Sequence, residues 1–190
     1  MSTPLAPLDP PPGGVPPRAE MVRELRGLVR DLAAALLVCA VVLAFLFQPF
    51  KVEGTSMQPR LTADERILVN KMVYRFWPVE RGDVVVFWFP GDPARSFIKR
   101  VIGLPGDVVE IRAGGVLVNG DLLSEPYVPE AFRERQDFGP VRVEGETYFV
   151  LGDHRSVSND SRSWGMVAEE LIYGKAVLRY WPFGRAGVID

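Results

Sequence analysis

The longest apolar stretch of the chain lies near its N-terminus. Leu32 to Phe47 are 16 uncharged and almost wholly apolar residues, and Gln48 and Pro49 end the run. A helix that is apolar on every side has no polar stripe to turn toward water, so a core or a lipid bilayer must surround it. The run is slightly shorter than the roughly 17–25 residues of a typical membrane span. We therefore predict one N-terminal transmembrane helix within residues 18–49.

Two other interpretations of this run stay open. A cleavable signal sequence has a similar length, but small residues of the A-x-A type do not follow the run, which continues into Gln48 and Pro49. A buried core helix would need more surrounding core than this chain can supply. The flank before the run carries four arginines, Arg18, Arg23, Arg26 and Arg30. Because positive flanks stay in the cytoplasm, we expect a cytoplasmic N-terminus and an extracytoplasmic chain after Lys51.

Beyond Lys51 the pattern changes to short runs rich in Val, Ile and Phe, separated by Gly or Pro, which is typical of β-strands. The expected strands are Arg66–Asn70, Asp83–Phe89, Phe97–Ile102, Asp107–Arg112, Thr147–Leu151 and Ile172–Trp181. Asn119 and Gly120 between apolar runs predict a hairpin with a type I′ turn within Gly115–Leu123. No long helical period follows the apolar run. We therefore predict an all-β domain of antiparallel sheets, packed or partly closed into a barrel-like shape.

Composition divides the chain into three parts. Residues 1–17 hold seven prolines and two glycines, so they cannot bury a core and are expected to form a disordered tail. Residues 18–49 comprise the basic flank and the anchor, and residues 50–190 comprise the β domain. Within that domain, about 113–146 is predicted to form a small hairpin and an insert. Its polar, Pro-bearing part, residues 124–140, is expected to be a surface excursion.

Charge and cysteine content exclude several function classes. The net charge of −2 over 190 residues gives no reason to expect nucleic acid as a partner. The single cysteine, Cys39, excludes an intramolecular disulfide. No cysteine–histidine cluster has metal-ligand spacing, and no Gly-rich phosphate loop is present. We therefore expect no metal and no other cofactor.

The segment just after the anchor, which begins at Gly54, holds a candidate nucleophile. Gly54 precedes Ser56 by two residues, where it lets the backbone approach a ligand or take a positive φ. Pro59 fixes the chain three residues after the serine. Serine alone is a weak nucleophile, so Ser56 needs a nearby base to take its proton.

Two side chains compete for the role of that base. His154 is the one histidine of the chain, and it would be the base of a Ser-His-Asp arrangement. Lys99 lies in an expected strand, where alternation puts either Lys99 or Arg100 on a face with large apolar groups. A desolvated lysine with a pKa of about 7–8 can act as a base, whereas an arginine stays charged. A surface lysine with its ammonium in water is the ordinary alternative.

A third polar segment joins these two candidates. It runs from Gly152 to Arg162 and reads G-D-H-R-S-V-S-N-D-S-R. Together with Ser56–Leu61 and Lys99–Asp107, this segment resembles the three boxes of bacterial type I signal peptidases, the leader peptidases with a Ser-Lys dyad. The boxes occur in the family's order, and the resemblance spans roughly residues 30 to 182. In this chain Arg60 stands in a threonine place and His154 in an asparagine place.

The resemblance implies a membrane-anchored serine endopeptidase that removes signal peptides from exported preproteins. It implies that Ser56 is the nucleophile and Lys99 the general base, which leaves His154 as a surface hydrogen-bonding residue. A hydroxyl that orients the lysine and three charges that brace its loop are also implied, and they are Ser158, Asp160, Arg162 and Arg100. The ordinary alternative for the loop charges is a solvated ion pair. The expected partners are preproteins and membrane lipid, because the aromatic runs Val84–Phe89 and Tyr74–Trp77 match a family surface that contacts the membrane.

Substrate is expected to bind as an added strand that pairs with the segment before Ser56 and with another edge. Apolar residues that alternate along that segment or match the family's pocket positions are Phe50, Val52, Met57, Leu61, Phe97 and Ile98. They are expected to line shallow sites for small side chains, with plain core packing as the alternative for each. The backbone N–H of Ser56 is the implied oxyanion donor. Some relatives add a hydroxyl two residues earlier, where this chain has Gly54.

Two rival functions differ from this interpretation. A self-cleaving regulator with a Ser-Lys dyad would be soluble and would carry a DNA-binding helical segment, whereas residues 1–50 offer an anchor. A membrane-tethered β module that only binds would need no catalytic residues, and an intact Ser56 and Lys99 argue against it. A cleavage assay discriminates between the enzyme and the binding module.

Overall fold

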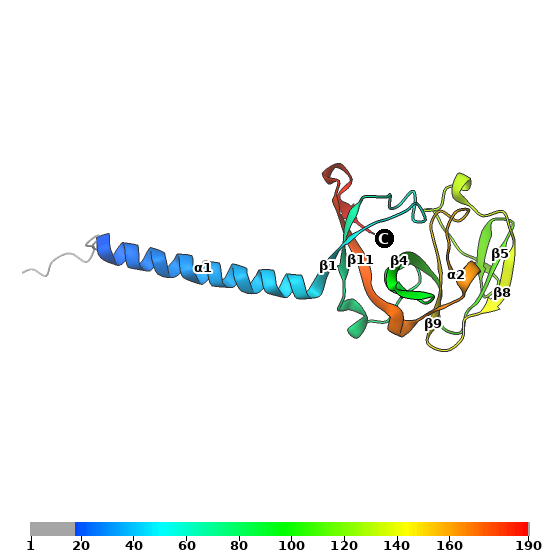
Figure 1. Ribbon diagram of the computed structural model, residues 1–190, viewed down its shortest axis with the longest axis horizontal. Helices are drawn as coiled ribbons and strands as arrows, with labels where there is room; N and C mark the ends of the chain where they lie inside the picture. Colours follow the sequence, from blue (N-terminus) through cyan, green and yellow to red (C-terminus); the bar gives the residue numbers. More distant parts are fainter. Residues whose placement is uncertain (1–17, 190) are drawn as a thin grey trace, which may run out of the picture. The chain divides into compact units, whose positions relative to one another are not determined.

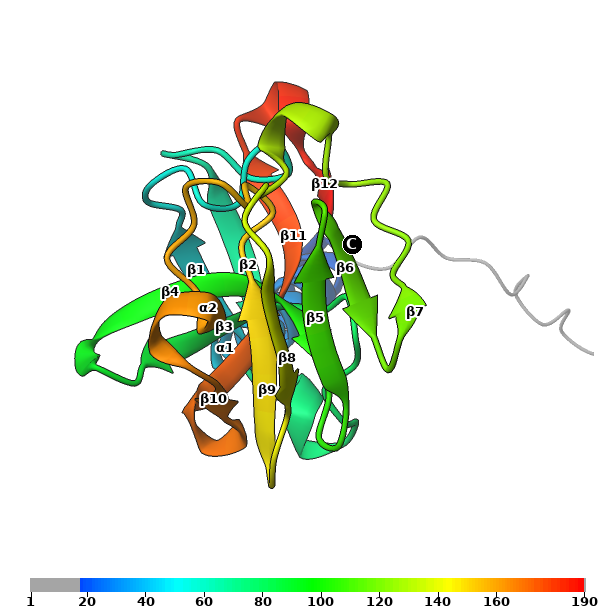
Figure 2. The same ribbon diagram turned by 90° about the vertical axis from the view of Figure 1, so that its right-hand side faces the viewer.

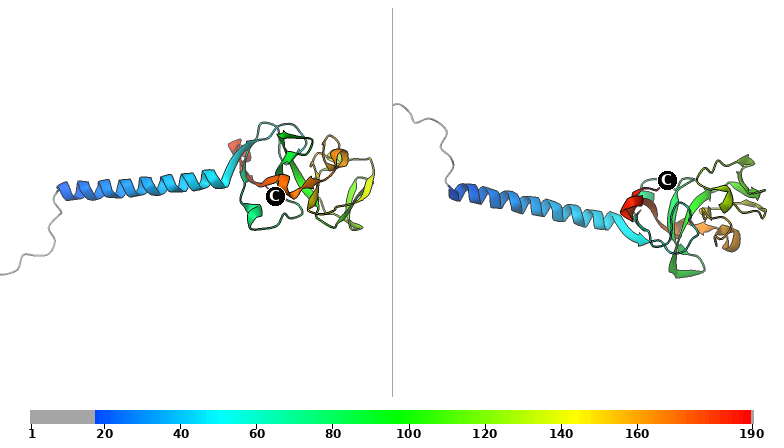
Figure 3. Two further views of the ribbon diagram at one scale, coloured as in Figure 1. Left: turned by 60° about the horizontal axis from the view of Figure 1, so that its bottom comes forward. Right: turned by 90° about the horizontal axis from the view of Figure 1, so that it is seen from above.

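The computed structural model describes residues 18–189, and the predicted disordered tail of residues 1–17 lies outside the described residues. The chain divides into two compact units, with the division at residues 43 and 44. Helix α1 (Arg18–Leu46) contains all of the described part of the first unit, and Figure 3 shows it as one uninterrupted helix. Its most apolar window has a mean hydropathy of 2.3, and none of that window is buried within the protein. Among residues 18–189, α1 is the one helix whose length and composition suit a membrane span.

The second unit is built from two antiparallel sheets (Figure 1). The large sheet has the order β1–β2–β11–β3–β4–β9–β10, and β12 pairs with β11. Its strands are β1 (Phe47–Lys51), β2 (Arg66–Asn70), β3 (Val84–Phe89), β4 (Asp92–Gly103), β9 (Thr147–Leu151), β10 (Val167–Ala168), β11 (Ile172–Trp181) and β12 (Gly187–Val188). The small sheet has the order β7–β6–β5–β8 (Figure 2). Its strands are β5 (Val108–Arg112), β6 (Gly115–Val118), β7 (Asp121–Leu122) and β8 (Phe138–Arg142).

Short helices fill the connections. They are the 3-10 turns η1 (Val73–Arg75), η2 (Glu130–Phe132), η3 (Glu169–Leu171) and η4 (Phe183–Arg185), and the single α-turn α2 (Ser161–Trp164). The antiparallel sheets and the N-terminal apolar helix confirm the predicted fold class. Among the described strands the two ends of the large sheet, β1 and β10, do not pair with each other, so the sheet is open and not a closed barrel.

The predicted hairpin is present between β6 and β7. Val118 pairs with Asp121, and the two turn residues Asn119 and Gly120 have φ angles of 55° and 90°. Both positive angles are those that a type I′ turn requires. The predicted excursion of residues 124–140 contains η2 and reaches into β8, which pairs with β5. The excursion therefore ends as part of the small sheet, a pairing that its polar and Pro-bearing sequence does not predict.

The continuous apolar run on β3 is explained by burial on both faces. Val84 and Val86 pack in one core with Ile98 of β4, while Val85 and Phe87 pack in a second core with Val101 of β4. The run is therefore mostly interior, and its exposed part alone is available to the membrane-contacting surface that the resemblance implies. The exposed aromatic side chains that remain are Trp88 on β3 and Phe76 and Trp77 after η1.

A third core joins the two sheets. Ile102 on β4 and Phe149 on β9 pack against Val109 on β5 and Val116 on β6. The chain leaves β4 and enters β5 through a tight turn, which is fastened because Asp107 accepts hydrogen bonds from Leu104 N and from the Arg81 guanidinium. The second half of β4 is consequently held between all three cores, and it is a rigid place from which to project a side chain.

Candidate active site

Ser56 lies in a turn that two buried apolar side chains hold down. Met57 and Leu61 are almost completely buried in the same core as Val84, and Leu61 N donates to Met57 O at 2.8 Å. Gly54 has a φ of +78°, a left-handed conformation that side chains with a Cβ rarely adopt. The glycine and the apolar anchors together keep Ser56 at the surface of the core, where its side chain is only half-buried.

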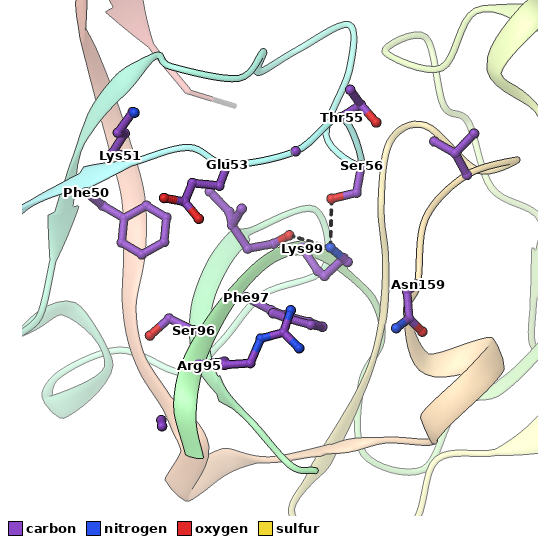
Figure 4. Close-up of a pocket in the computed structure, with 14 residues that line it drawn as sticks. Phe50, Lys51, Glu53, Thr55, Ser56, Arg95, Ser96, Phe97, Lys99 and Asn159 are labelled. Carbon is purple, nitrogen blue, oxygen red and sulfur yellow. Dashed lines mark hydrogen bonds between the residues drawn. The ribbon is translucent and has the colours of Figure 1, made fainter. Parts of the chain in front are cut away.

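Lys99 reaches Ser56 from the middle of β4. Its Nζ donates to Ser56 Oγ at 2.8 Å and to the carbonyl of Ile98 at 3.0 Å, as Figure 4 shows. The side chain is 4% exposed, and its Nζ lies 5.3 Å from the centre of the Phe97 ring. A strand buried by three cores thus delivers an amine to a serine that lies 43 residues earlier in the chain.

Burial sets the protonation of this lysine. Desolvation lowers the pKa of Lys99 from its ordinary value of 10.5 to about 8. The charges of Asp160 and Asp153 raise the pKa, but from a distance, because among the described residues no carboxylate bonds to the amine. A substantial fraction of Lys99 is therefore neutral at mildly alkaline pH, as a general base requires.

The pair lies in a cavity of about 640 Å³ between two backbone segments (Figure 4). One wall comprises residues 50 and 51 at the end of β1 and residues 53–56 after it, and the other comprises residues 94–99 of β4. Among the described strands, β1 pairs only with β2, and β4 pairs with β9 only from Arg100 onward. Both walls therefore present strand edges with unpaired backbone groups toward the cavity.

The loop from Gly152 to Asp160 closes the site behind Ser56. His154 N donates to the carbonyl of Ser56 at 3.0 Å. A Cβ on Gly152 would lie 2.6 Å from Ser158 Cβ and inside van der Waals contact with the carbonyl of Ser56. Only a glycine therefore lets the loop come this close to the serine. The hydroxyl of Ser158 is buried beside it and has no hydrogen-bond partner among the described residues.

Ion pairs hold this loop. Both oxygens of Asp160 accept from the Arg162 guanidinium at 2.8 Å, and Asp160 also accepts from Gly152 N at 3.0 Å. Arg100 makes a two-pronged pair with Asp153 at 2.9 and 2.8 Å, with side chains 2% and 0% exposed. The aspartates that approach Lys99 are thus neutralised by arginines, which limits how far they raise its pKa.

The structure brings together some of the residues singled out from the sequence and separates others. Three of the pocket candidates line the cavity with Ser56 and Lys99, and they are Phe50, Phe97 and Ile98. The other three, Val52, Met57 and Leu61, lie in the core and do not line the cavity. His154 makes no side-chain hydrogen bond to Ser56, and its ring lies 4.2 Å from that of Phe132. Among the described residues the backbone N–H of Ser56 donates to no protein acceptor, so it is available to an oxyanion.

Several residues of the site were not singled out from the sequence. Polar and small residues on the cavity walls are Lys51, Glu53, Thr55, Ala94, Arg95, Ser96 and Asn159. Gly152 stood in a recognised box, but its packing role depends on a contact with Ser56 that sequence spacing does not reveal. Among residues 18–189 no group of three or more His, Cys, Asp or Glu side chains is arranged to hold a metal ion.

We predict that Gly152→Ala lowers kcat/KM for peptide-bond cleavage by about 100-fold, because a methyl group there must displace Ser56 or Ser158 by a large part of an ångström. The same overpacking is expected to lower the free energy of unfolding by about 1–3 kcal/mol. Gly184→Ala is the matched control, since its Cβ meets no atom within 4 Å. Steady-state kinetics and denaturant unfolding of both variants measure these effects. A folded Gly152→Ala protein with parental kinetics would contradict the packing argument.

Comparison with known proteins identifies the family. The family described as "Signal peptidase, peptidase S26" matches residues 25–181. The chain is 41% identical over 166 residues to a probable signal peptidase I-2 of Synechocystis sp., which covers 80% of this chain and 74% of that protein. It is 38% identical over 172 residues to signal peptidase I of Bacillus licheniformis, with 85% and 91% covered, and 36% identical over 179 residues to signal peptidase IB of Staphylococcus aureus, with 86% and 93% covered. The chain therefore belongs to the signal peptidase family, peptidase S26, and is a serine peptidase.

Proposed function

We propose that this chain is a membrane-anchored endopeptidase that removes N-terminal signal peptides from exported preproteins, with Ser56 as nucleophile and neutral Lys99 as general base. The observation that carries the proposal is the 2.8 Å contact between Lys99 Nζ and Ser56 Oγ inside a cavity that buries the amine. Membership of the signal peptidase family supports the substrate class. It also disfavours the self-cleaving regulator as an alternative.

In the acylation step, the neutral amine of Lys99 accepts the proton of Ser56 while Oγ attacks the scissile carbonyl carbon. The backbone N–H of Ser56 stabilises the negative charge that develops on the carbonyl oxygen. The Lys99 ammonium then returns its proton to the nitrogen of the leaving amine, and the acyl group stays on Oγ. In deacylation the neutral amine takes a proton from an attacking water, and the bond between the acyl carbon and Oγ breaks. The Lys99 ammonium gives its proton to Oγ, which regenerates the serine, and the new carboxylic acid leaves as its carboxylate.

The supporting residues hold Lys99 and the loop beside it in place, while burial lowers the pKa of the lysine. Ser158 is positioned next to Gly152 and is free to hydrogen-bond the amine once substrate excludes water. Asp160 with Arg162 holds the loop that carries Ser158, and Arg100 with Asp153 holds the start of that loop. None of these charges contacts the amine directly, so they act by positioning.

The preprotein binds as a strand added between the two cavity walls, because both present unpaired backbone edges. Alternate side chains of such a strand point the same way, toward a lining to which one wall contributes Phe50 and the other contributes Phe97 and Ile98. These large side chains leave only shallow sites between the two walls, and shallow sites suit small substrate side chains. That shape fits the A-x-A pattern at the end of secretory signals.

Helix α1 anchors the enzyme, with residues 18–49 as basic flank and membrane span. The arginines before the apolar run favour a cytoplasmic N-terminus, so residues 50–190 lie on the outer side of the plasma membrane, where preproteins emerge. The partners are therefore preproteins and membrane lipid. No nucleic acid, metal or other cofactor enters the proposed reaction.

The catalytic assignment predicts that Ser56→Ala and Lys99→Ala each lower preprotein cleavage by at least about 1,000-fold, because nucleophile and base act as one unit. For the parent, kcat/KM should rise with pH through about 8, where Lys99 loses its proton. His154→Asn is the control and should keep most of the activity. Cleavage of a purified preprotein in detergent measures all four proteins. Cleavage by the Ser56→Ala protein would favour a binding module with a contaminating protease. Loss of activity in His154→Asn would instead favour His154 as the general base.

A second prediction concerns the free energy that the burial of Lys99 costs. With a folded pKa near 8 and an ordinary value of 10.5, Lys99 costs about 3 kcal/mol of unfolding free energy at all pH values below 8. Between these pKa values the unfolded chain binds a proton that the folded chain does not, so the cost shrinks as pH rises and vanishes above 10.5. Lys99→Met keeps most of the stem and removes the amine, although Ser56 Oγ loses its partner. We expect this variant to be inactive but about 1–2 kcal/mol more stable than the parent at pH 7, with the gap closing toward pH 10. Denaturant unfolding at several pH values measures the gap, and a clearly less stable variant at pH 7 would show that Lys99 is not a desolvated base.

The proposed orientation predicts a one-sided pattern of proteolysis. Protease added to the outside of spheroplasts should degrade the β domain and spare the residues before Arg30. Antibodies to an N-terminal and a C-terminal tag report which part survives. Loss of the N-terminal tag alone would reverse the orientation.

A further inference from the structure

A buried ion pair outside the site connects a distant segment to the loop behind Ser56. The Arg155 guanidinium donates through Nη1 to Glu125 Oε2 at 2.9 Å, through Nη2 to Glu125 Oε1, and through Nε to the carbonyl of Gly152 at 2.9 Å. The two side chains are 3% and 0% exposed. Glu125 lies between β7 and η2, 30 residues before Arg155, in the segment that the sequence marks as a surface excursion.

Tyr127 links this pair to the ion pair on β4. Its hydroxyl donates to Glu125 Oε1 at 3.0 Å, and its ring lies 4.0 Å from the Arg100 guanidinium carbon. Arg100 in turn holds Asp153. The segment around Glu125 is therefore connected to the first two residues of the loop. Arg155 connects it to Gly152, and Arg100 connects it to Asp153.

Any displacement of Gly152 also displaces Ser56 or Ser158, because the three residues are in close contact. No atom fits between its Cα and the carbonyl of Ser56 or the side chain of Ser158. His154 N, two residues on, bonds to the same carbonyl. A bidentate pair fixes both the position and the orientation of a guanidinium group. The pair with Glu125 therefore determines where Arg155 Nε can hydrogen-bond the carbonyl of Gly152.

We propose that Glu125 is a positioning residue of the Ser56–Lys99 site, acting through Arg155 to hold Gly152 against Ser56 and Ser158. This inference rests on the proposed function. A buried ion pair is weak evidence of stabilisation, because the cost of desolvating both charges offsets most of their attraction. The fixed geometry of the ion pair, by contrast, holds a loop that contacts the nucleophile in one position.

The charges around Lys99 decide how the site responds when the loop loosens. Asp153 and Asp160 face the lysine from the loop, and Arg100 follows it on β4. The charged residues on the cavity walls are Lys51, Glu53 and Arg95. Desolvation is the largest influence on the lysine. Water that enters beside a loosened loop therefore favours the ammonium, even though the two aspartates also move away.

The test compares full-length variants in detergent. Glu125→Gln removes the charge that holds Arg155, and Glu125→Gln combined with Arg155→Gln removes the pair without leaving a buried unpaired charge. We expect kcat for preprotein cleavage to fall by about 10-fold or more in both, with KM changed by less than about threefold. We also expect the midpoint of the acid limb of kcat/KM to move to higher pH by about half a unit or more. Glu130→Gln is the matched control from the same segment, since its side chain is 91% exposed, and it should match the parent.

A purely structural role makes a different prediction. It lowers the folded fraction, which scales the activity but leaves the midpoint of the acid limb unchanged. An unchanged midpoint in the folded double variant, or a double variant that cannot fold, overturns the positioning role. The parent and Ser56→Ala are measured in the same series. A parent that does not cleave, or an active Ser56→Ala, refutes the proposed function itself, and the positioning role falls with it.

Discussion

The site depends on one physical constraint, a lysine amine buried without a carboxylate to hold its proton. Lys99 is 4% exposed and bonds only to Ser56 Oγ and to a backbone carbonyl among the described residues. A carboxylate in contact would stabilise the ammonium and remove the base. The surrounding wall must nevertheless be polar, because it also has to hold a loop in a fixed place. The structure meets both demands because the two aspartates that approach the lysine, Asp153 and Asp160, pair with arginines instead.

Strand β4 connects this constraint to substrate binding. Its C-terminal half lies between β3 and β9 and belongs to all three cores, which dries and fixes the position of Lys99. Its N-terminal half does not pair with β9 and presents an unpaired strand edge to the cavity. In the proposed mechanism, a single strand thus provides a rigid position for the base and an unpaired edge for an extended peptide. The change from one condition to the other occurs next to Lys99, where β9 ends at Leu151.

The sequence predicts those features that depend on local patterns. Apolar runs between Gly and Pro predicted most strands of the large sheet, and Asn119-Gly120 predicted the hairpin because its turn geometry is set by two residues. Strand β8 was missed, since it gains its stability from pairing with β5 and has little pattern of its own. Alternation along β4 put Lys99 on a face with Phe97. For Val52, Met57 and Leu61, by contrast, the sequence pattern did not distinguish a position on the cavity wall from a position in the core. Both kinds of position are apolar, and only the three-dimensional path of the turn distinguishes them.

Glu125 and Arg155 mark the limit of local inference most clearly. Each is an ordinary charged residue in a polar segment, and nothing near either one in the sequence indicates that its partner lies 30 residues away. Water exclusion explains why such pairs belong beside this lysine. The same low dielectric that disfavours an ammonium strengthens the attraction between a carboxylate and a guanidinium, so paired ions tolerate the environment that a neutral base requires. Arginine is suited to this place because it keeps its charge where a lysine would lose it. A loop of arginine–carboxylate pairs is therefore a wall that stays ordered and charged beside an amine whose pKa burial lowers to about 8.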